Sequence, residues 1–281
     1  MPFSPVIRAP ALLTALALLG GCALGTADPA AGTGGQGLFR TDRTPADAPY
    51  TSADLVRNFS RIAFGVEPAI NKGSTQSDFL RRWQSPVRWR LHARDPAELA
   101  ADEDLSATAT RIAAATGHDI APAAPGTAAN LDIWLLAQGD FPAALDWARL
   151  SRPGRNRASL IRDFRVSGLP CFSQFSYRVR PGVDLPRGTI TYALVLVRKG
   201  MDRLYRQSCF EEELAQVIGL TNDDNRVRPS IFNDDEEFVL LTSHDEALLS
   251  LLYHPSLRPG MAPDEALPII EALLAGKDTW P

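Results

Sequence analysis

The residues with the clearest spacing for chemistry lie in one segment, Cys209–Asp224, with the sequence CFEEELAQVIGLTNDD. Glu212 and Gln216 are four positions apart and would share one face of a helix, and Asn222 follows a glycine that can end that helix. Three side chains spaced in this way can converge on one metal ion, with the glutamate between the first two acting as general base. The spacing predicts a vestigial cleft lined by Glu212, Glu213, Gln216, Gly219 and Asn222, with Glu213 as the candidate catalytic residue.

This spacing resembles HExxHxxGxxH, the elongated zinc-binding helix of a class of metalloproteases, with every histidine replaced. Zinc prefers imidazole and thiolate ligands, and the neutral amides of Gln216 and Asn222 are poor substitutes. We therefore expect no metal, zinc in particular, and no other cofactor. Without a metal, nothing lowers the pKa of a bound water toward neutrality, and Glu213 alone cannot supply that chemistry. The alternative is a chance resemblance, in which the glutamates form a solvated face and Gly219 is an ordinary helix cap.

Several segments around the motif have the apolar patterns of helices and strands. The motif lies in a predicted helix over residues 202–218, and the run TITYALVLV before it predicts a strand buried on both faces. Other expected elements are a helix from Ser52, a short helix with Phe79, Leu80 and Trp83, a long helix over residues 95–116 capped by Gly117, and strands over residues 86–91, 130–136 and 171–179. Their order indicates an α+β, zincin-like (metzincin-like) single domain, with a mixed twisted sheet, a long helix and the motif helix.

The first residues have the order of a lipoprotein secretion signal. One cation, Arg8, precedes an apolar run that ends in LGGC, which places Cys22 where a diacylglycerol would be attached. The run is too short to span a bilayer, which needs about 20 apolar residues. An ordinary cleavable signal with a chance cysteine is the alternative. We expect a signal peptide over residues 1–21, a flexible tether over residues 22–50 and the domain over residues 51–281.

Lipidation at Cys22 would anchor the chain to a membrane. Ala23 follows it in place of aspartate, which favours the outer membrane, facing the periplasm. The formal net charge of the whole chain is −4, so we do not expect nucleic acid as a partner. Cys171 and Cys209 are the two other cysteines, in a compartment that permits disulfides. We favour a bridge between them, and two buried free thiols are the alternative.

Other candidate groups have simpler structural explanations. The segment Ser243–Glu246 is a predicted capping box, with Ser and Glu three positions apart, in preference to a site with a catalytic histidine. The acidic residues 223–224 and 233–237 lack the spacing of a calcium loop, and we expect them to form a solvated surface partly paired with arginines. Glu67 could join the motif glutamates in a carboxylate pair for glycoside cleavage, which only their separation in space would define.

Two strings in the C-terminal half, CFEEELAQVIGLTNDDNRVRPSIFNDDEEF and LLTSHDEALLSLLYHPSLRPGM, resemble those of a family of bacterial lipoproteins that carry a domain of unknown function. The resemblance extends from Leu55 to Ile270, and the residues at family positions include Glu67, Trp83, Asn130 and Cys171. It implies a lipid-anchored, zincin-like domain with no established activity, in which the missing zinc ligands are the rule of the family.

These observations predict a lipid-anchored cell-envelope protein of unknown function. In the interpretation that we favour, it is a non-catalytic binding module whose metal-free cleft holds a protein or envelope ligand, such as an extended peptide added to an edge strand. The alternative is an atypical hydrolase of peptides or peptidoglycan with Glu213 as general base. In a third interpretation the motif is a core helix with no site.

Overall fold

Strand β6 (Thr189–Arg198) lies inside the sheet, as its nearly unbroken run of apolar and β-branched residues predicts. It pairs in parallel with β4 (Leu131–Leu136) and with the short β1 (Arg82–Trp83). It pairs in antiparallel with β5 (Cys171–Tyr177). The computed structural model describes residues 39–65, 77–93, 99–150, 157–178 and 185–275.

The parallel part of the sheet continues beyond β4. Strand β2 (Val87–His92) pairs with β4, and β3 (Ile120–Pro122) pairs with β2. Among the described strands, β1, β3 and β5 each pair with a single neighbour; β3 ends the parallel part of the sheet, and both β5 and the two-residue β1 pair with β6. The sheet is thus mostly parallel, with one antiparallel strand, β5, at the edge that bears Cys171.

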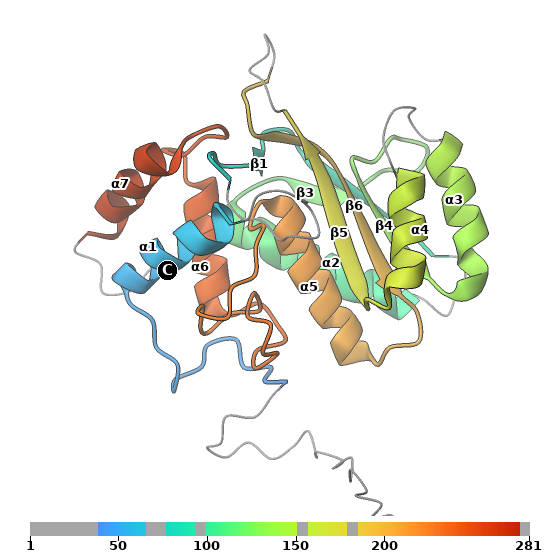
Figure 1. Cartoon of the computed structure of the whole chain (residues 1–281), viewed down its shortest axis with the longest axis horizontal. Helices are drawn as coiled ribbons and strands as arrows, with labels where there is room; N and C mark the ends of the chain where they lie inside the picture. Colours follow the sequence, from blue (N-terminus) through green and yellow to red (C-terminus); the bar gives the residue numbers. More distant parts are fainter. Residues whose placement is uncertain (1–38, 66–76, 94–98, 151–156, 179–184, 276–281) are drawn as a thin grey trace, which may run out of the picture. The chain divides into compact units, whose positions relative to one another are not determined.

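Helices cover both faces of this sheet (Figure 1). Every residue of β4 is buried, and its alternate side chains point to opposite faces. On one face, Trp134 and Leu136 pack against α3 (Phe141–Leu150) and α4 (Arg157–Ser167). On the other, Ile133 and Leu135 belong to the main core, to which α2 (Leu99–Thr116) and α5 (Arg203–Ile218) contribute.

Three further helices complete the main core. Helix α6 (Ser243–Tyr253) contacts α2 and α1 (Ser52–Ala63), and α7 (Pro263–Leu274) contacts α1. Within the described ranges, no helix has the length and apolar content needed to cross a membrane. The chain is thus a mixed α/β domain with a long helix and a motif helix, while the zincin-like arrangement is not confirmed.

Most of the expected elements are present within a few residues of their predicted bounds. The motif helix α5 begins one residue later than expected because Asp202 is its N-cap and accepts a hydrogen bond from the backbone N–H of Tyr205. The predicted short helix around Trp83 is wrong, because Arg82 and Trp83 form β1 and pair with β6. The indole N–H of Trp83 donates to the carbonyl of Val217 at 2.8 Å. The sequence patterns did not reveal β3, α3, α4 or α7.

The predicted capping box at the start of α6 is displaced by one residue. The N-cap is Thr242, and its hydroxyl and the carboxylate of Asp245 satisfy each other's backbone amides. His244 is fully buried, and its Nε2 lies 3.0 Å from the amide nitrogen of Asn58. The histidine is therefore a core residue at the junction of α1 and α6.

Part of the expected tether contacts the domain. The N–H of Arg40 donates to the carbonyl of Glu237 at 2.7 Å, and the guanidinium of Arg43 donates two hydrogen bonds to Glu211 on α5. Pro45 and Ala48 are buried. By these contacts, residues 39–50 pack on the domain, whereas the signal peptide, Cys22 and the rest of the tether lie outside the described residues.

Glu237 gives this contact a pH dependence. Its carboxylate accepts from Arg228 at 2.7 Å and from Arg40 at 3.2 Å, and these bonds, that to Arg228 first, hold its pKa below the usual range although burial opposes them. A lowered folded pKa means that the stabilisation is complete above the unfolded pKa of about 4.3 and is lost as the pH falls through the folded pKa.

We expect Glu237→Gln to lower the free energy of unfolding by about 1 to 2 kcal/mol at neutral pH, since hydrogen bonds to charged groups are stronger than neutral ones. The difference from the wild type should shrink in acid, where the wild-type carboxyl is itself protonated. Urea denaturation across this pH range measures it, with the exposed Glu271→Gln as the matched control. A difference that does not change with pH would contradict this account.

Candidate functional site

Helix α5 places the motif residues, and Gly219 ends it. The N–H of Gly219 donates to the carbonyls of Ala215 and Gln216, and its φ of +135° lies in a region that favours glycine. A Cβ at this position would lie 2.4 Å from the carbonyl oxygen of Arg81, so no other residue fits without displacing backbone. Gly219 therefore shapes the turn after α5, but it is not among the residues that line the pocket.

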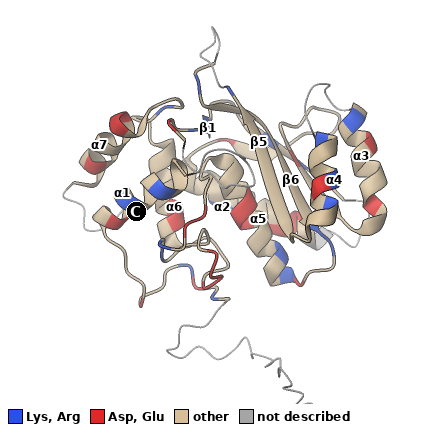
Figure 2. Cartoon of the chain, viewed as in Figure 1, with Lys and Arg blue, Asp and Glu red and all other residues tan. Residues whose placement is uncertain are grey.

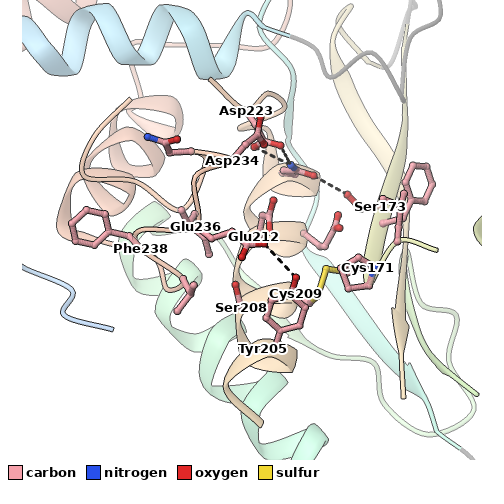
Figure 3. Close-up of a pocket in the computed structure, with 18 residues that line it drawn as sticks. Cys171, Ser173, Tyr205, Ser208, Cys209, Glu212, Asp223, Asp234, Glu236 and Phe238 are labelled. Atoms are coloured by element: carbon pink, nitrogen blue, oxygen red, sulfur yellow. Dashed lines mark hydrogen bonds between the residues drawn. A yellow bond between two sulfur atoms is a disulfide. The ribbon is translucent and has the colours of Figure 1, made fainter. Parts of the chain in front are cut away.

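A pocket of about 280 Å³ lies between α5, the start of β5 and the loop that follows α5 (Figure 3). Three of the five predicted cleft residues line it: Glu212, Glu213 and Gln216. The loop supplies Asp223, Asp234 and Glu236, and β5 supplies Cys171 and Ser173. The motif face of α5 is thus one wall of a real depression.

Gln216 bridges two walls of this pocket. Its side-chain carbonyl accepts a hydrogen bond from the hydroxyl of Ser173 on β5 at 3.4 Å, and its amide nitrogen lies 3.3 Å from both carboxylate oxygens of Asp223 (Figure 3). The residue is only 3 % exposed. A buried side-chain amide needs both a donor and an acceptor partner, and Gln216 finds them on opposite sides. Gln216 therefore joins β5 to the loop.

The structure does not bring Asn222 into the pocket. Its amide nitrogen donates to the carbonyl of Arg61 at 3.1 Å, near the C-terminal end of α1, and its side chain lies against Gly65. Asn222 therefore connects the loop to α1. Glu67, the other carboxylate considered for catalysis, lies outside the described residues.

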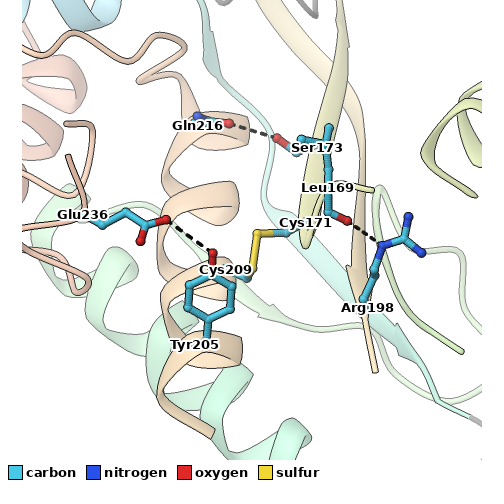
Figure 4. Close-up of a disulfide and its surroundings, with 8 residues drawn as sticks. All are labelled: Leu169, Cys171, Ser173, Arg198, Tyr205, Cys209, Gln216 and Glu236. Atoms are coloured by element: carbon cyan, nitrogen blue, oxygen red, sulfur yellow. Dashed lines mark hydrogen bonds between the residues drawn. A yellow bond between two sulfur atoms is a disulfide. The ribbon is translucent and has the colours of Figure 1, made fainter. Parts of the chain in front are cut away.

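The disulfide between Cys171 and Cys209 is confirmed, with a Cα–Cα distance of 5.8 Å (Figure 4). It joins β5 to α5 beside the pocket, and both cysteines line it. Tyr205, one turn earlier on α5, points its hydroxyl at Glu236 with an O–O distance of 3.4 Å. Partial burial raises the pKa of Tyr205, and the nearby Glu236 carboxylate raises it further. Tyr205 therefore stays protonated at neutral pH and can donate to Glu236.

The loop residues are the part of the site that the motif did not indicate. Asp223, Asp234 and Glu236 belong to the acidic stretches that we expected to form a solvated surface. The expected pairing with arginines is confirmed for Asp224 with Arg226 and for Glu237 with Arg228, and Asp234 and Glu236 are exposed as expected, although they also line the pocket. The signal that could have indicated Asp223, Asp234 and Glu236 is their charge. They add negative charge beside α5, a helix already rich in glutamate (Figure 2).

The chemistry of the lining residues is that of an anionic pocket. Five carboxylates line it, and none of its described lining residues is Lys, Arg or His. The lining carboxylates are Glu212, Glu213, Asp223, Asp234 and Glu236. In the described parts of the chain, no group of three or more His, Cys, Asp or Glu side chains is arranged to hold a metal ion. Such a pocket can attract a cationic group, with Tyr205 and Ser173 as further polar contacts.

Comparison with known proteins gives a family and no function. No curated protein and no solved structure matches the chain. Residues 52–272 match the family described as "Protein of unknown function (DUF2927)". This range contains α1 to α6, the six strands of the sheet, the disulfide and the pocket, and most of α7. The chain therefore belongs to the DUF2927 family of proteins of unknown function.

Proposed function

We propose that this chain is a non-catalytic binding module of the cell envelope, whose pocket beside α5 holds a cationic group of a protein or envelope ligand. The observation that carries the proposal is the set of five carboxylates around a pocket of about 280 Å³. That volume suits the end of a lysine or arginine side chain. Lipidation at Cys22 would hold the module at the outer membrane, facing the periplasm.

The electrostatics of the pocket favour this occupant. Two of the carboxylates lie on α5, and Glu213 is buried, so charge interactions at this wall are screened less than on an open surface. Two exposed carboxylates, Asp234 and Glu236, lie at the loop side, where a ligand would enter. A cation would gain attraction from both walls.

The hydrolase alternative, with Glu213 as general base, receives less support. Glu213 lines the pocket, but a site that hydrolyses a peptide bond must also stabilise the negative charge that develops on the carbonyl oxygen in the transition state. The described lining residues offer no cationic side chain for that purpose, and four further carboxylates would repel such a charge. The same arrangement favours the binding of a cation.

Titration of the purified protein with Nα-acetyl-lysine methylamide tests the proposal. We expect its Nε-acetylated counterpart, which has no charge, to bind at least about tenfold more weakly, a difference of about 1.4 kcal/mol. Glu212→Gln should weaken binding of the charged ligand, and higher salt should do the same. Glu271→Gln, on the exposed face of α7, is the matched control and should have no effect. Equal binding of both ligands would contradict the proposal.

A further inference from the structure

Residues 39–43 form a strap that lies against the loop on one side of the pocket (Figure 1). The N–H of Phe39 donates to the carbonyl of Glu236 at 2.8 Å. In the opposite direction, the N–H of Val239 donates to the carbonyl of Arg40 at 3.1 Å. Glu236 and Val239 both line the pocket. The strap is therefore bonded directly to the wall that a ligand would contact.

The backbone of this wall, residues 236–239, has few other supports. A third bond to the strap runs from the N–H of Arg40 to the carbonyl of Glu237. Among the described residues, the one further backbone–backbone hydrogen bond of this segment joins Glu236 to Asn233, within the same loop. In the ranges that the structure describes, the strap is thus the only other segment to which the backbone of this wall is hydrogen-bonded.

Glu236 has a backbone conformation that needs such support. Its φ is +55°, and the φ of its partner Phe39 is +67°. Residues other than glycine adopt this left-handed conformation only where surrounding contacts hold it. The conformation places the Glu236 carboxylate beside the hydroxyl of Tyr205 on α5 (Figure 4). Release of the strap would let Glu236 leave this conformation and move its carboxylate away from the pocket.

The side chain of Arg40 fixes the strap in place. Its guanidinium donates two hydrogen bonds to Asp42 and two to Asp47, at distances of 2.6 to 3.0 Å. A further bond goes to Glu237 at 3.2 Å, and the guanidinium lies 4.6 Å from the ring centroid of Phe238, which lines the pocket. A lysine ammonium lacks the planar fork that makes these bonds together. Docking of the strap therefore depends on an arginine at this position.

We infer that the strap holds the acidic loop in the form that binds the cation, so that docking of the strap and binding of the ligand strengthen each other. Two events that are coupled in this way must favour each other by the same factor. The strap belongs to the predicted tether between Cys22 and the domain, so the coupling connects the attachment of the chain with its ligand. This inference rests on the proposed function, because it concerns the same pocket.

Titration of Arg40→Ala with Nα-acetyl-lysine methylamide tests the inference, because charge and position predict opposite results. By charge alone, removing a cation beside the acidic loop would strengthen the binding of a cationic ligand. Loss of the strap should instead weaken binding by at least about fivefold, the lower end of usual coupling factors. Arg40→Lys keeps the charge but not the fork, and should also weaken binding. Arg149→Ala removes a surface cation on α3 and is the matched control, with no expected effect.

Hydrogen exchange of the wild type measures the reciprocal effect and needs no variant. The amides of Phe39 and Arg40 are bonded to the loop but do not line the pocket, so the ligand does not cover them directly. With saturating Nα-acetyl-lysine methylamide, both should exchange at least about fivefold more slowly. The amide of Ala275, bonded to the carbonyl of Glu271 at the end of α7, is the control and should not change. A merely structural role of Arg40 would leave the exchange of the strap independent of the ligand.

The outcomes separate the two proposals. If the ligand binds Arg40→Ala as well as the wild type, or more tightly, the coupling is overturned and the cationic pocket stands. Exchange at Phe39 and Arg40 that the ligand does not slow overturns the coupling as well, and this result decides if circular dichroism shows the alanine variant to be unfolded. If the ligand does not bind the wild type, both proposals fail.

Discussion

The double variant Cys171→Ala/Cys209→Ala should unfold with a free energy about 4 kcal/mol smaller than that of the wild type. The two cysteines are 38 positions apart, and closing a loop of this size removes that much chain entropy from the unfolded state in the loop-closure model. Alanine is the suitable replacement because Cys209 is buried, and serine would add an unsatisfied hydroxyl there. Urea denaturation measures the loss.

The wild type under reducing conditions is the control for this variant. It should lose a similar free energy, because reduction opens the same bond without changing the side-chain packing of the core. A loss below about 1 kcal/mol in both cases would contradict the view that the bridge stabilises the contact of β5 with α5. The variant should also bind the lysine ligand more weakly, since both bridged elements line the pocket.

The second large effect is expected from Arg43→Ala, at a position that we first assigned to the tether. Glu211 on α5 is 1 % exposed and accepts hydrogen bonds from both terminal nitrogens of Arg43, at 2.8 and 2.7 Å. The backbone N–H of Leu241 and the side chain of Gln207 are its remaining partners. Removing the arginine leaves a buried carboxylate without its counter-charge, which costs about 3 kcal/mol or more.

Arg149→Ala is the matched control for Arg43→Ala. Arg149 pairs with Asp146 on the surface of α3, where both side chains are mostly exposed, and such a pair contributes at most about 1 kcal/mol. Chemical denaturation of the two variants measures the contrast. Equal, small losses would mean that residues 39–50 do not stabilise the domain.

The sequence predicts those parts of the fold whose causes are local. The bounds of α5 and β6 follow from a capping aspartate, a terminal glycine and a continuous apolar run. The apolar pattern of the sequence did not indicate helices α3 and α4. Their apolar residues cover a sheet face that is formed by strands distant in the sequence. The apolar spacing around Trp83 predicts a helix, but pairing with β6 gives this segment an extended conformation.

The candidate site likewise has one part that local sequence patterns predict and one part that depends on tertiary contacts. Helical spacing places Glu212, Glu213 and Gln216 on one wall of the pocket, because residues three and four positions apart share a helix face. Asn222 lies after the turn at Gly219, and the path of the chain beyond that turn depends on tertiary contacts with α1. The acidic loop residues reach the pocket from the same stretch, and no local pattern gives that path.

An NMR titration of the purified, isotope-labelled protein with Nα-acetyl-lysine methylamide tests the central claim most directly, because it locates the bound cation. We predict that the largest amide shifts arise at Ser173, Glu212, Gln216 and the loop over residues 233–239, and that Glu212→Gln reduces them. Shifts of equal size with the Nε-acetylated ligand, or shifts confined to other elements, would contradict a cation-binding pocket at α5.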